Sequence, residues 1–402
     1  MNIFNSLGSN YNFKFVLTSL FTGNNAIYKK ELETFLEKKY GGQVILLYKG
    51  REVIRLVLKS LNLPEGSFVA INGFTCFAVY EAIKKAGLNV EYLDIEKSDL
   101  NFSPSTLEEK LTGNPKIKVV IIQNTLGYPC QIEQIADICK NHNLILIEDL
   151  AHSLGTRYPS GILAGRIGDL VVLSFSQDKM IDAVSGGALI KRTGAKPFHL
   201  KGGTDLHLRD VSERRQLIDR LYPFFTYVIR KTYSFGVGKV LHFILKNLHL
   251  LSGPMDRISN NLHQLPSWYC HLVNLEFANL QNDLTHRSKV ASIYSDLISP
   301  KVISKTITQQ IDLSSNLRFP IFVNNRSSLI KYLAKQGIYV SDIWYDAPIA
   351  PKKYLQATDY LSQCPNAELA ASEILNLPTH KQVSPKDAVN ISQLINQWLK
   401  LQ

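Results

Sequence analysis

The chain has 402 residues, of which 45% are apolar and 20% charged, and its formal net charge is +11. This composition is typical of a globular protein that is long enough for two or three domains. The positive charge fits a solvated basic surface, an anionic substrate, an acidic membrane face or nucleic acid. Nucleic acid is the weakest of these, because the sequence has no CxxC pair, no zinc-type spacing of Cys and His and no Arg-rich tract. We therefore predict neither a nucleic-acid partner nor a metal site.

The cysteines and the apolar runs indicate in which cellular compartment the protein is expected. The cysteines are odd in number and scattered, at Cys76, Cys130, Cys139, Cys270 and Cys364. Such a set fits reduced thiols in a cytosol better than a disulfide framework. The first residues show no basic stretch that leads into a long apolar one, and no charge-free run reaches the length of a transmembrane helix. We expect a cytoplasmic protein.

Residues 1–202 alternate between helical and strand-like patterns. Helices are predicted at 30–40, from about Arg51, at 79–87 with Gly87 as C-cap, and at 132–142. Short apolar runs predict strands at 44–48, 67–74, 90–95, 117–125, 144–152, 169–176 and 186–192. Continuous apolar runs between helices are typical of a largely parallel sheet covered on both faces. The pattern predicts a large α/β domain with an N-terminal arm.

The pattern changes over residues 203–264, which we interpret as a hydrophobic, basic insertion. Its segment 221–253 is rich in aromatic and aliphatic residues and holds Arg230, Lys231, Lys239 and Lys246, but no Asp or Glu. These features fit a helix that lies in an anionic lipid interface, which gives the hypothesis of peripheral membrane contact. The alternative is an arm packed on the body of the protein or in a dimer interface.

Residues 265–402 begin with a helical pattern and continue as a mixture of strands and helices. We predict a connecting helix followed by a smaller α+β domain. Its strands are expected at 318–324 and 338–345, and its helices at 327–337 and 367–375.

Several polar groups follow predicted strands of the first domain. Asp149 ends one strand, Ser174 and Ser176 end the next, and Lys179 lies just beyond them. Gly50 and Arg51 follow the first strand and open a helix. Ligands of open α/β sheets bind at the carboxyl ends of strands, so these groups can meet in one site. Taken singly, each also has an ordinary structural interpretation as a cap, a turn or a surface side chain.

Together these residues are suited to pyridoxal phosphate. The cofactor needs a lysine for a Schiff base and a carboxylate for its pyridine nitrogen. Its phosphate needs amides at a helix N-terminus, a hydroxyl and an arginine, which Ser174 and Arg51 supply. The lysine must be neutral to act as a nucleophile, and desolvation favours that state. Glycines just after Lys179 allow the backbone to approach closely.

The stretches "LILIEDLAHSLGT", "GRIGDLVVLSFSQDK" and "SGGALI" resemble the DegT/DnrJ/StrS-type sugar aminotransferases, a branch of the fold type I pyridoxal-phosphate enzymes. The resemblance covers roughly residues 30–200 and 265–402. It implies that Asp149 pairs with the pyridine nitrogen, that His152 lies against the cofactor, that Ser174 holds the phosphate and that Lys179 carries the cofactor covalently.

Upstream, "YKGREVIRLVLKSL" and "FTCFAVYEAIKKAG" are similar to further segments of the family. The resemblance puts Gly50, Arg51 and Glu52 at the cofactor phosphate and Cys76 where many members place an aromatic ring. Two of these positions depart from the family, because Arg51 replaces a small hydroxyl residue and Cys76 cannot stack as a ring does.

The family's asparagine-tyrosine-arginine stretch, which in relatives reaches the neighbouring subunit's active site, is not found in residues 203–265. Asn260, Asn261 and Arg257 are candidates to replace it. His380, Trp344 and Tyr345 are weaker candidates for the substrate side, because such residues are more often part of a core.

The resemblance implies a homodimer that moves an amino group, usually from glutamate, to a keto sugar of a nucleotide-sugar for polysaccharide or secondary-metabolite biosynthesis.

Two alternative functions remain. One is a dehydratase-like chemistry on the same scaffold, which Lys179 disfavours because that branch replaces the lysine. The other is a non-catalytic or membrane-associated protein. A nicotinamide dehydrogenase and a serine hydrolase fit poorly, since neither G-x-G-x-x-G after a strand nor G-x-S-x-G occurs.

Overall fold

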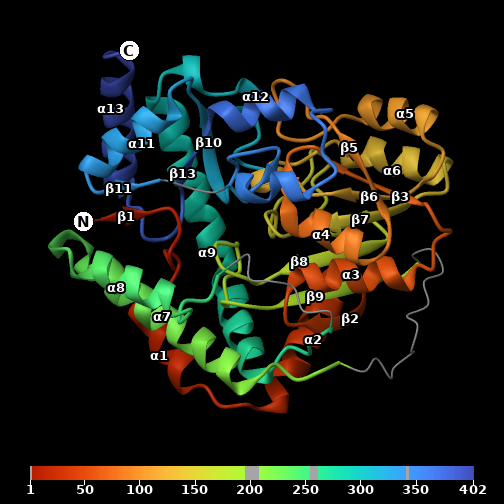
Figure 1. Ribbon diagram of the computed structural model, residues 1–402, viewed down its shortest axis with the longest axis horizontal. Coiled ribbons are helices and arrows are strands. Elements are labelled where there is room, and N and C mark those ends of the chain that lie inside the picture. Colours follow the sequence, from red (N-terminus) through yellow and green to blue (C-terminus); the bar gives the residue numbers. More distant parts are fainter. Residues whose placement is uncertain (1, 195–207, 254–260, 341–343) are drawn as a thin grey trace.

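The computed structural model describes residues 2–194, 208–253, 261–340 and 344–402, and a seven-stranded sheet lies at its centre (Figure 1). The strand order is β2-β9-β8-β7-β6-β3-β5, and β9 runs antiparallel to both of its neighbours whereas the other pairs are parallel. The strands are β2 (Gly42–Leu47), β3 (Phe68–Asn72), β5 (Asn89–Leu93), β6 (Ile117–Ile122), β7 (Ile145–Asp149), β8 (Leu170–Ser174) and β9 (Gly187–Arg192). The predicted α/β class and the mostly parallel sheet are confirmed.

Helices cover both faces of this sheet, which explains why its strands are continuous apolar runs. Alternate residues of a strand point to opposite faces. Val119 and Ile121 of β6 accordingly join one buried cluster, and Val120 and Ile122 join the other. The first cluster includes residues of α3 and α4, and the second includes residues of α2, α5 and α6. These helices are α2 (Ala26–Tyr40), α3 (Gly50–Ser60), α4 (Phe77–Lys85), α5 (Pro104–Gly113) and α6 (Ile132–Asn141).

The C-terminal part begins with α9 (Ser267–Leu297), which has 31 residues. The antiparallel pair of β10 (Arg318–Phe322) and β13 (Ile374–Pro378) follows. The other elements are the α-helices α10 (Lys305–Gln309), α11 (Arg326–Lys335), α12 (Pro365–Glu373) and α13 (Pro385–Leu399), the short strands β11 (Ile338–Tyr339) and β12 (Ile349–Ala350), and the 3-10 helices η1 (Thr125–Gly127), η3 (Pro300–Val302) and η4 (Lys352–Ala357).

Two expectations for this part are corrected. The strand predicted at 338–345 is reduced to β11, because Trp344 and Tyr345 lie in a turn, and 341–343 fall outside the described residues. The helix predicted at 367–375 ends at Glu373, and Ile374 already pairs with Phe322 in the sheet.

Short pairings join the first part of the chain to the C-terminal part. β1 (Ile3–Phe4) pairs with β11, and β4 (Thr75–Cys76) pairs with β12. The N-terminal arm therefore lies against the C-terminal part, as Figure 1 shows. The division at residues 202 and 264 stays a prediction, and its first boundary lies outside the described residues.

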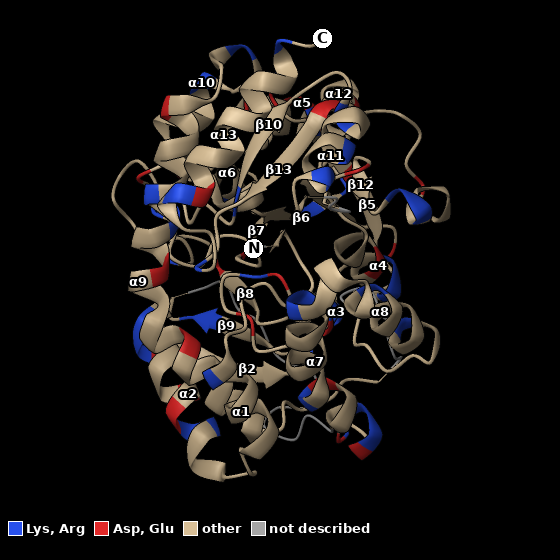
Figure 2. Ribbon diagram, turned by 90° about the vertical axis from the view of Figure 1, so that its left-hand side faces the viewer, with Lys and Arg blue, Asp and Glu red and all other residues tan. Residues whose placement is uncertain are grey.

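The described part of the insertion is mostly helical. α7 (Glu213–Thr232) continues through the 3-10 helix η2 (Tyr233–Phe235) to α8 (Val237–Asn247), and α7 packs on α1 (Phe13–Phe21) (Figure 1). Lys239 and Lys246 give α8 positive charge, and Figure 2 shows blue but no red along this helix. Within the described ranges, no helix is long and apolar enough to cross a membrane.

Glu148, next to Asp149 on β7, is buried on the side of the strand opposite to its neighbour. Its carboxylate accepts hydrogen bonds from the Tyr158 hydroxyl at 2.7 Å and from the backbone N–H groups of Gly165, Ile167 and Gly168 at 2.6, 2.8 and 2.5 Å. The carboxylate thereby holds the loop that leads into β8.

We expect Glu148→Gln to lower the free energy of unfolding by about 2–3 kcal/mol, because an amide nitrogen would face buried N–H donors and leave one unsatisfied. Urea denaturation followed by circular dichroism measures this. Glu109→Gln, at an exposed position of α5, is the matched control. Equal stability of the two variants would contradict the holding role of Glu148.

Candidate active site

A pocket lies at the carboxyl ends of the central strands, where the sequence places its polar groups. Asp149 ends β7 and Ser174 ends β8, whereas Gly50 and Arg51 open α3 after β2. The lining residues come from these strand ends and from the loops after them: Gly50, Arg51, Ile54, Cys76, Ala78, Val79, Gln123, Asp149, Ala151, His152, Val172, Ser174, Ser176, Gln177, Lys179 and Trp344. Seven of the eight residues predicted for the site therefore meet here, namely Gly50, Arg51, Cys76, Asp149, His152, Ser174 and Lys179.

The backbone at the start of α3 packs too closely for side chains. A Cβ on Gly50 would lie 2.9 Å from Ser174 Cβ, and one on Gly187 would lie 2.7 Å from Gly50 N and Cα. Both glycines are therefore required by close approach rather than by backbone conformation. The approach brings the positive end of the α3 dipole beside the Ser174 hydroxyl, an arrangement that suits an anion.

Lys179 is partly buried at the pocket wall. Desolvation lowers the pKa of its amine, although the charge of the nearby Asp149 acts in the opposite direction. The amine lies 5.7 Å from the centre of the Trp344 ring, and the Lys179 carbonyl accepts from the Asn10 side chain at 3.4 Å. A lysine with a lowered pKa has a larger neutral fraction, which makes it a better nucleophile and base.

Asp149 is the acid of the pocket. Burial raises the pKa of its carboxyl to about 6, while a hydrogen bond from the Ala151 N–H at 3.0 Å and the charge of Lys179 act in the opposite direction. A cationic partner would restore the ionised form, because opposite charge at close range favours it.

His152 has a neutral ring in this setting. Burial and the positive charges of Lys179 and Arg318 hold its pKa well below the usual range. Its Nδ1 accepts from the Leu126 N–H at 3.3 Å and lies 3.4 Å from the Tyr345 hydroxyl. The imidazole is thus held as a flat polarisable wall of the pocket.

Cys76 lies in the pocket as the N-cap of α4. Its thiol accepts from the Ala78 N–H at 3.3 Å, and burial raises its pKa, so that it stays protonated.

Glu52 is not among the lining residues, and its predicted place, where the backbone meets the phosphate, stays a prediction. Its carboxylate is turned toward His263, with the backbone N at 3.0 Å and Nδ1 at 3.1 Å, because α3 carries its first turn past the pocket rim. It ties α3 to the segment before α9.

The weaker candidates for the substrate side do not all lie at the pocket. Trp344 lines the pocket and Tyr345 contacts His152, but His380 lies elsewhere and its Nε2 donates to the Phe4 carbonyl at 2.8 Å. The Asn261 carbonyl accepts from the Arg55 guanidinium at 2.9 Å. Arg257 and Asn260 lie outside the described residues.

Sequence reasoning missed Gln123 and the support of the lysine loop. Gln123 follows β6 directly and hydrogen-bonds the Thr75 hydroxyl, so the strand-end rule could have found it. Asn10 donates to Asp182 Oδ2 at 3.2 Å, and the Tyr11 hydroxyl donates to Oδ1 of the same carboxylate. No signal in the sequence pairs residues that are about 170 positions apart.

The model of the DegT/DnrJ/EryC1/StrS aminotransferase family matches residues 17–198 and 260–396, which is well over half of the chain. The chain belongs to this family. The segment between the two matched ranges coincides with most of the insertion, so the insertion is where this family member departs from the common pattern.

Relatives of this family member include proteins named for the synthesis of nucleotide-linked amino sugars. The chain is 30% identical over 190 residues to GDP-perosamine synthase of Escherichia coli O157:H7, a match that covers 46% of this chain and 51% of the relative, about half of each. It is 26% identical to dTDP-4-amino-4,6-dideoxy-D-glucose transaminase of Shigella dysenteriae, over 90% of this chain and 88% of the relative.

Solved structures show the same fold. The Spr1654 protein of Streptococcus pneumoniae in its PMP form superimposes with a TM-score of 0.70 at 18% identity, over 96% of each chain. The same protein is also known in a PLP form. Fold type I and the pyridoxal-phosphate cofactor of the family are thereby established for this chain.

The pocket of this family member fits that cofactor. The groups that the cofactor requires are all present on the lining: an amine, a carboxylate, a hydroxyl, an arginine and the N-terminus of α3. The close packing of Gly50 against Ser174 places the start of α3 beside the Ser174 hydroxyl, an arrangement that suits the cofactor's phosphate.

The raised pKa of Asp149 predicts that this functional residue lowers the stability of the cofactor-free protein. Because its folded pKa of about 6 exceeds the unfolded value of 3.8, ionisation of Asp149 above pH 6 destabilises the cofactor-free protein. Asp149→Asn should therefore stabilise that protein at pH 8 by up to about 3 kcal/mol.

The gain should shrink as the pH falls from 6 toward 3.8 and be small near pH 4, because Asp149 is then protonated in the folded state and close to half protonated in the unfolded state. Urea unfolding at the three pH values measures it, and Asp312→Asn, at an exposed position, is the control. A destabilised variant at pH 8 would contradict the burial argument.

Proposed function

We propose that the chain is a pyridoxal-phosphate-dependent aminotransferase that moves an amino group, supplied by glutamate, to the keto group of a nucleotide-linked sugar. The observation that carries this is the convergence of the Lys179 amine, the Asp149 carboxylate and the Gly50–Ser174 cradle on one pocket. The names of the relatives support the substrate class, since those proteins are named for GDP- and dTDP-linked amino sugars. Biosynthesis of a polysaccharide, another glycan or a secondary metabolite is the context that we infer.

Each side chain has a task in this proposal. The cofactor, when bound, supplies an aldehyde and an electron-accepting ring. Lys179 would hold it covalently, Asp149 would face its ring nitrogen, His152 would lie against the ring, and Ser174 with Arg51 would bind its phosphate. The charge of a protonated ring nitrogen would keep Asp149 ionised despite burial.

Proton transfer falls to Lys179. Because desolvation lowers the pKa of its amine, the neutral base is available to take the proton from the donor's α-carbon. The same amine can return a proton to the sugar carbon that receives the nitrogen. The buried walls around Lys179 limit the access of water to this carbon.

A homodimer with shared active sites and a cytoplasmic location complete the proposal. The charge of the chain, +11, suits a diphosphate-bearing substrate. A dehydratase-like chemistry is disfavoured, because the lysine that such enzymes replace is present and lines the pocket.

The absorbance spectrum of the purified protein with pyridoxal phosphate tests the function. We expect a visible band in the wild type that is absent in Lys179→Ala and that glutamate converts to the spectrum of the pyridoxamine form. Lys59→Ala, an exposed lysine of α3, is the matched control and should behave as the wild type.

Absence of the band in the wild type would contradict the proposed enzymatic function and favour the non-catalytic alternative. A Lys179-dependent band that does not respond to glutamate would instead contradict glutamate as the donor.

We further propose that α8 contacts an anionic lipid surface. Apolar side chains in and beside α8 are 45% to 82% exposed: Phe235, Val237, Val240, Phe243, Ile244 and Leu248. Val237, Val240 and Ile244 recur at a helical spacing and share one face. Lys239 and Lys246 are exposed as well, and residues 221–253 contain no acid. Lys239 and Lys246 lie on the other side of the helix from this face, where they can meet anionic headgroups while the apolar side chains enter the lipid. The positive charge without acid makes an anionic surface the favoured partner.

Cosedimentation with phosphatidylglycerol vesicles tests this contact. The wild type should bind, and the double variant Val240→Glu/Phe243→Glu should lose most of the binding, because two charges would enter the apolar face. Leu361→Glu, at a position that is 85% exposed in the C-terminal part, should bind as the wild type does. Failure of the wild type to bind, or loss of a dimer in the double variant, would overturn the lipid contact.

A further inference from the structure

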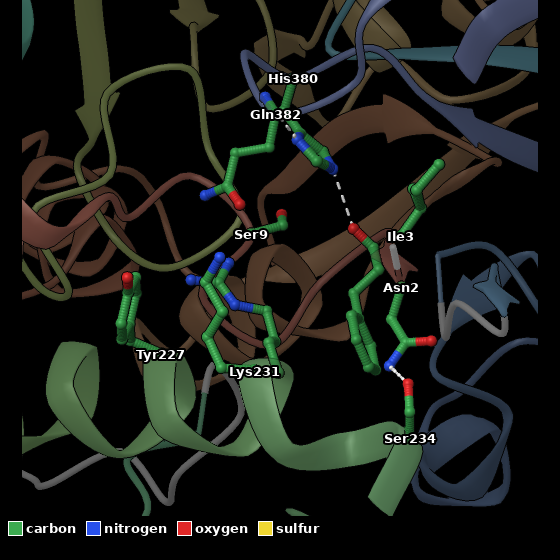
Figure 3. Close-up of a pocket in the computed structure, with 10 residues that line it drawn as sticks. Asn2, Ile3, Ser9, Tyr227, Lys231, Ser234, His380 and Gln382 are labelled. Carbon is green, nitrogen blue, oxygen red and sulfur yellow. Dashed lines mark hydrogen bonds between the residues drawn. The ribbon is translucent and has the colours of Figure 1, made fainter.

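A second cavity lies apart from the catalytic pocket and shares none of its lining residues. It has a volume of about 230 Å³ (Figure 3). Its walls come from three distant parts of the chain: the N-terminal segment that holds β1, the end of α7 with η2, and the residues after β13. The tertiary fold builds it, and the insertion supplies one wall.

The walls of this cavity are positively charged. Arg230 and Lys231 line it, and its lining includes no Asp or Glu. The Arg230 guanidinium donates to the carbonyls of Gly8 and Tyr11, the latter at 2.9 Å, so it is held in place by neutral acceptors and keeps its charge. Burial lowers the pKa of Arg230 to about 10, which leaves it protonated at neutral pH. Lys231 is exposed at the rim, 5.7 Å from the Tyr227 ring.

An unsatisfied hydroxyl lies in the same cavity. Ser9 is only 2% exposed, and its Oγ has no hydrogen-bond partner among the described residues. Leaving a buried hydroxyl without a partner is costly, so such a group calls for an explanation. Figure 3 shows Ser9, a residue of the N-terminal segment, in the midst of the other lining side chains.

The histidine of the cavity is already engaged. His380 Nε2 donates to the Phe4 carbonyl at 2.8 Å, and its Nδ1 accepts from the Gln382 N–H at 3.3 Å. His380 therefore shapes the wall and leaves the charged and hydroxyl donors of Arg230, Lys231 and Ser9 to meet a ligand.

We propose that this cavity binds the phosphate group of a small molecule, as a site separate from the catalytic pocket. Phosphate oxygens are acceptors that suit a guanidinium, an ammonium and a hydroxyl together. A water molecule occupies about 30 Å³ in the liquid, so a cavity of about 230 Å³ has room for several groups of that size. A phosphate group with a small organic part can therefore enter. The rings of Phe4 and Tyr227 offer an apolar wall for its organic part.

The source of the phosphate is either a free metabolite or a lipid headgroup, because the exposed face of α8 begins next to the cavity at Ser234 and Phe235. The segment 8–11 also reaches the catalytic loop, since Asn10 donates to the Lys179 carbonyl. A variant in this segment could change enzyme activity either through the cavity or through the Lys179 loop. Direct binding of the ligand is therefore the suitable measurement.

Isothermal titration of the protein saturated with pyridoxal phosphate tests the proposal, because the cofactor then occupies the phosphate cradle at Gly50. Inorganic phosphate and glycerol phosphate are the free probes, at constant ionic strength. Phosphatidylglycerol vesicles, compared with phosphatidylcholine vesicles, are the lipid probe.

We expect Lys231→Gln and Ser9→Ala each to weaken binding of the preferred probe at least 10-fold. Ser9→Ala should leave the melting temperature unchanged or raise it, because the lost hydroxyl makes no hydrogen bond. Lys59→Gln, at an exposed lysine of α3 that belongs neither to the cavity nor to α8, is the control.

Binding of either probe class that depends on Ser9 and Lys231 supports the site and names its source. Binding that is equal in all variants, or no binding of any probe by the wild type, overturns it. The Lys179-dependent absorbance band is measured independently, so failure of this site leaves the proposed function untouched.

Discussion

Burial of an amine and a carboxylate at one edge of the sheet is the constraint on which the rest of the site depends. Desolvation lowers the pKa of Lys179 and raises that of Asp149, so both groups are driven toward their neutral forms in the same pocket. The fold tolerates this cost because rigid elements surround the two groups. In the proposed function this cost is also useful, since it would provide a neutral base and a carboxyl that a cationic ring can ionise.

The rigid surroundings are built from distant parts of the chain. β7 and β8 fix Asp149 and Ser174 by strand pairing, whereas the loop of Lys179 is held by the N-terminal segment through Asn10. The close approach of Gly50 and Gly187 then sets how deeply α3 can enter the site. The geometry of the pocket is therefore a property of the sheet and the N-terminal arm together.

The insertion is integrated into this scaffold by one buried acid of α7. Asp219 accepts from the hydroxyls of Tyr48, Ser185 and Tyr269 at 2.6, 2.9 and 2.8 Å. Although burial opposes its charge, Lys49 and Arg215 hold the pKa of Asp219 below its usual value. This anchoring allows α7 to supply a wall of the second cavity while the apolar face of α8 stays exposed.

The sequence by itself determined the fold class, the strands of the large sheet and most of the catalytic lining, because apolar runs and strand ends are local signals. Tertiary structure decided the rest. Glu52 turned to His263 and His380 to Phe4, since the direction of a side chain depends on what packs against it. Asn10 contacts the Lys179 carbonyl, and Ser9 lines the same cavity as Arg230, although each pair is far apart in the sequence. No local pattern predicts such pairs, because contacts between distant residues form only when the whole core closes.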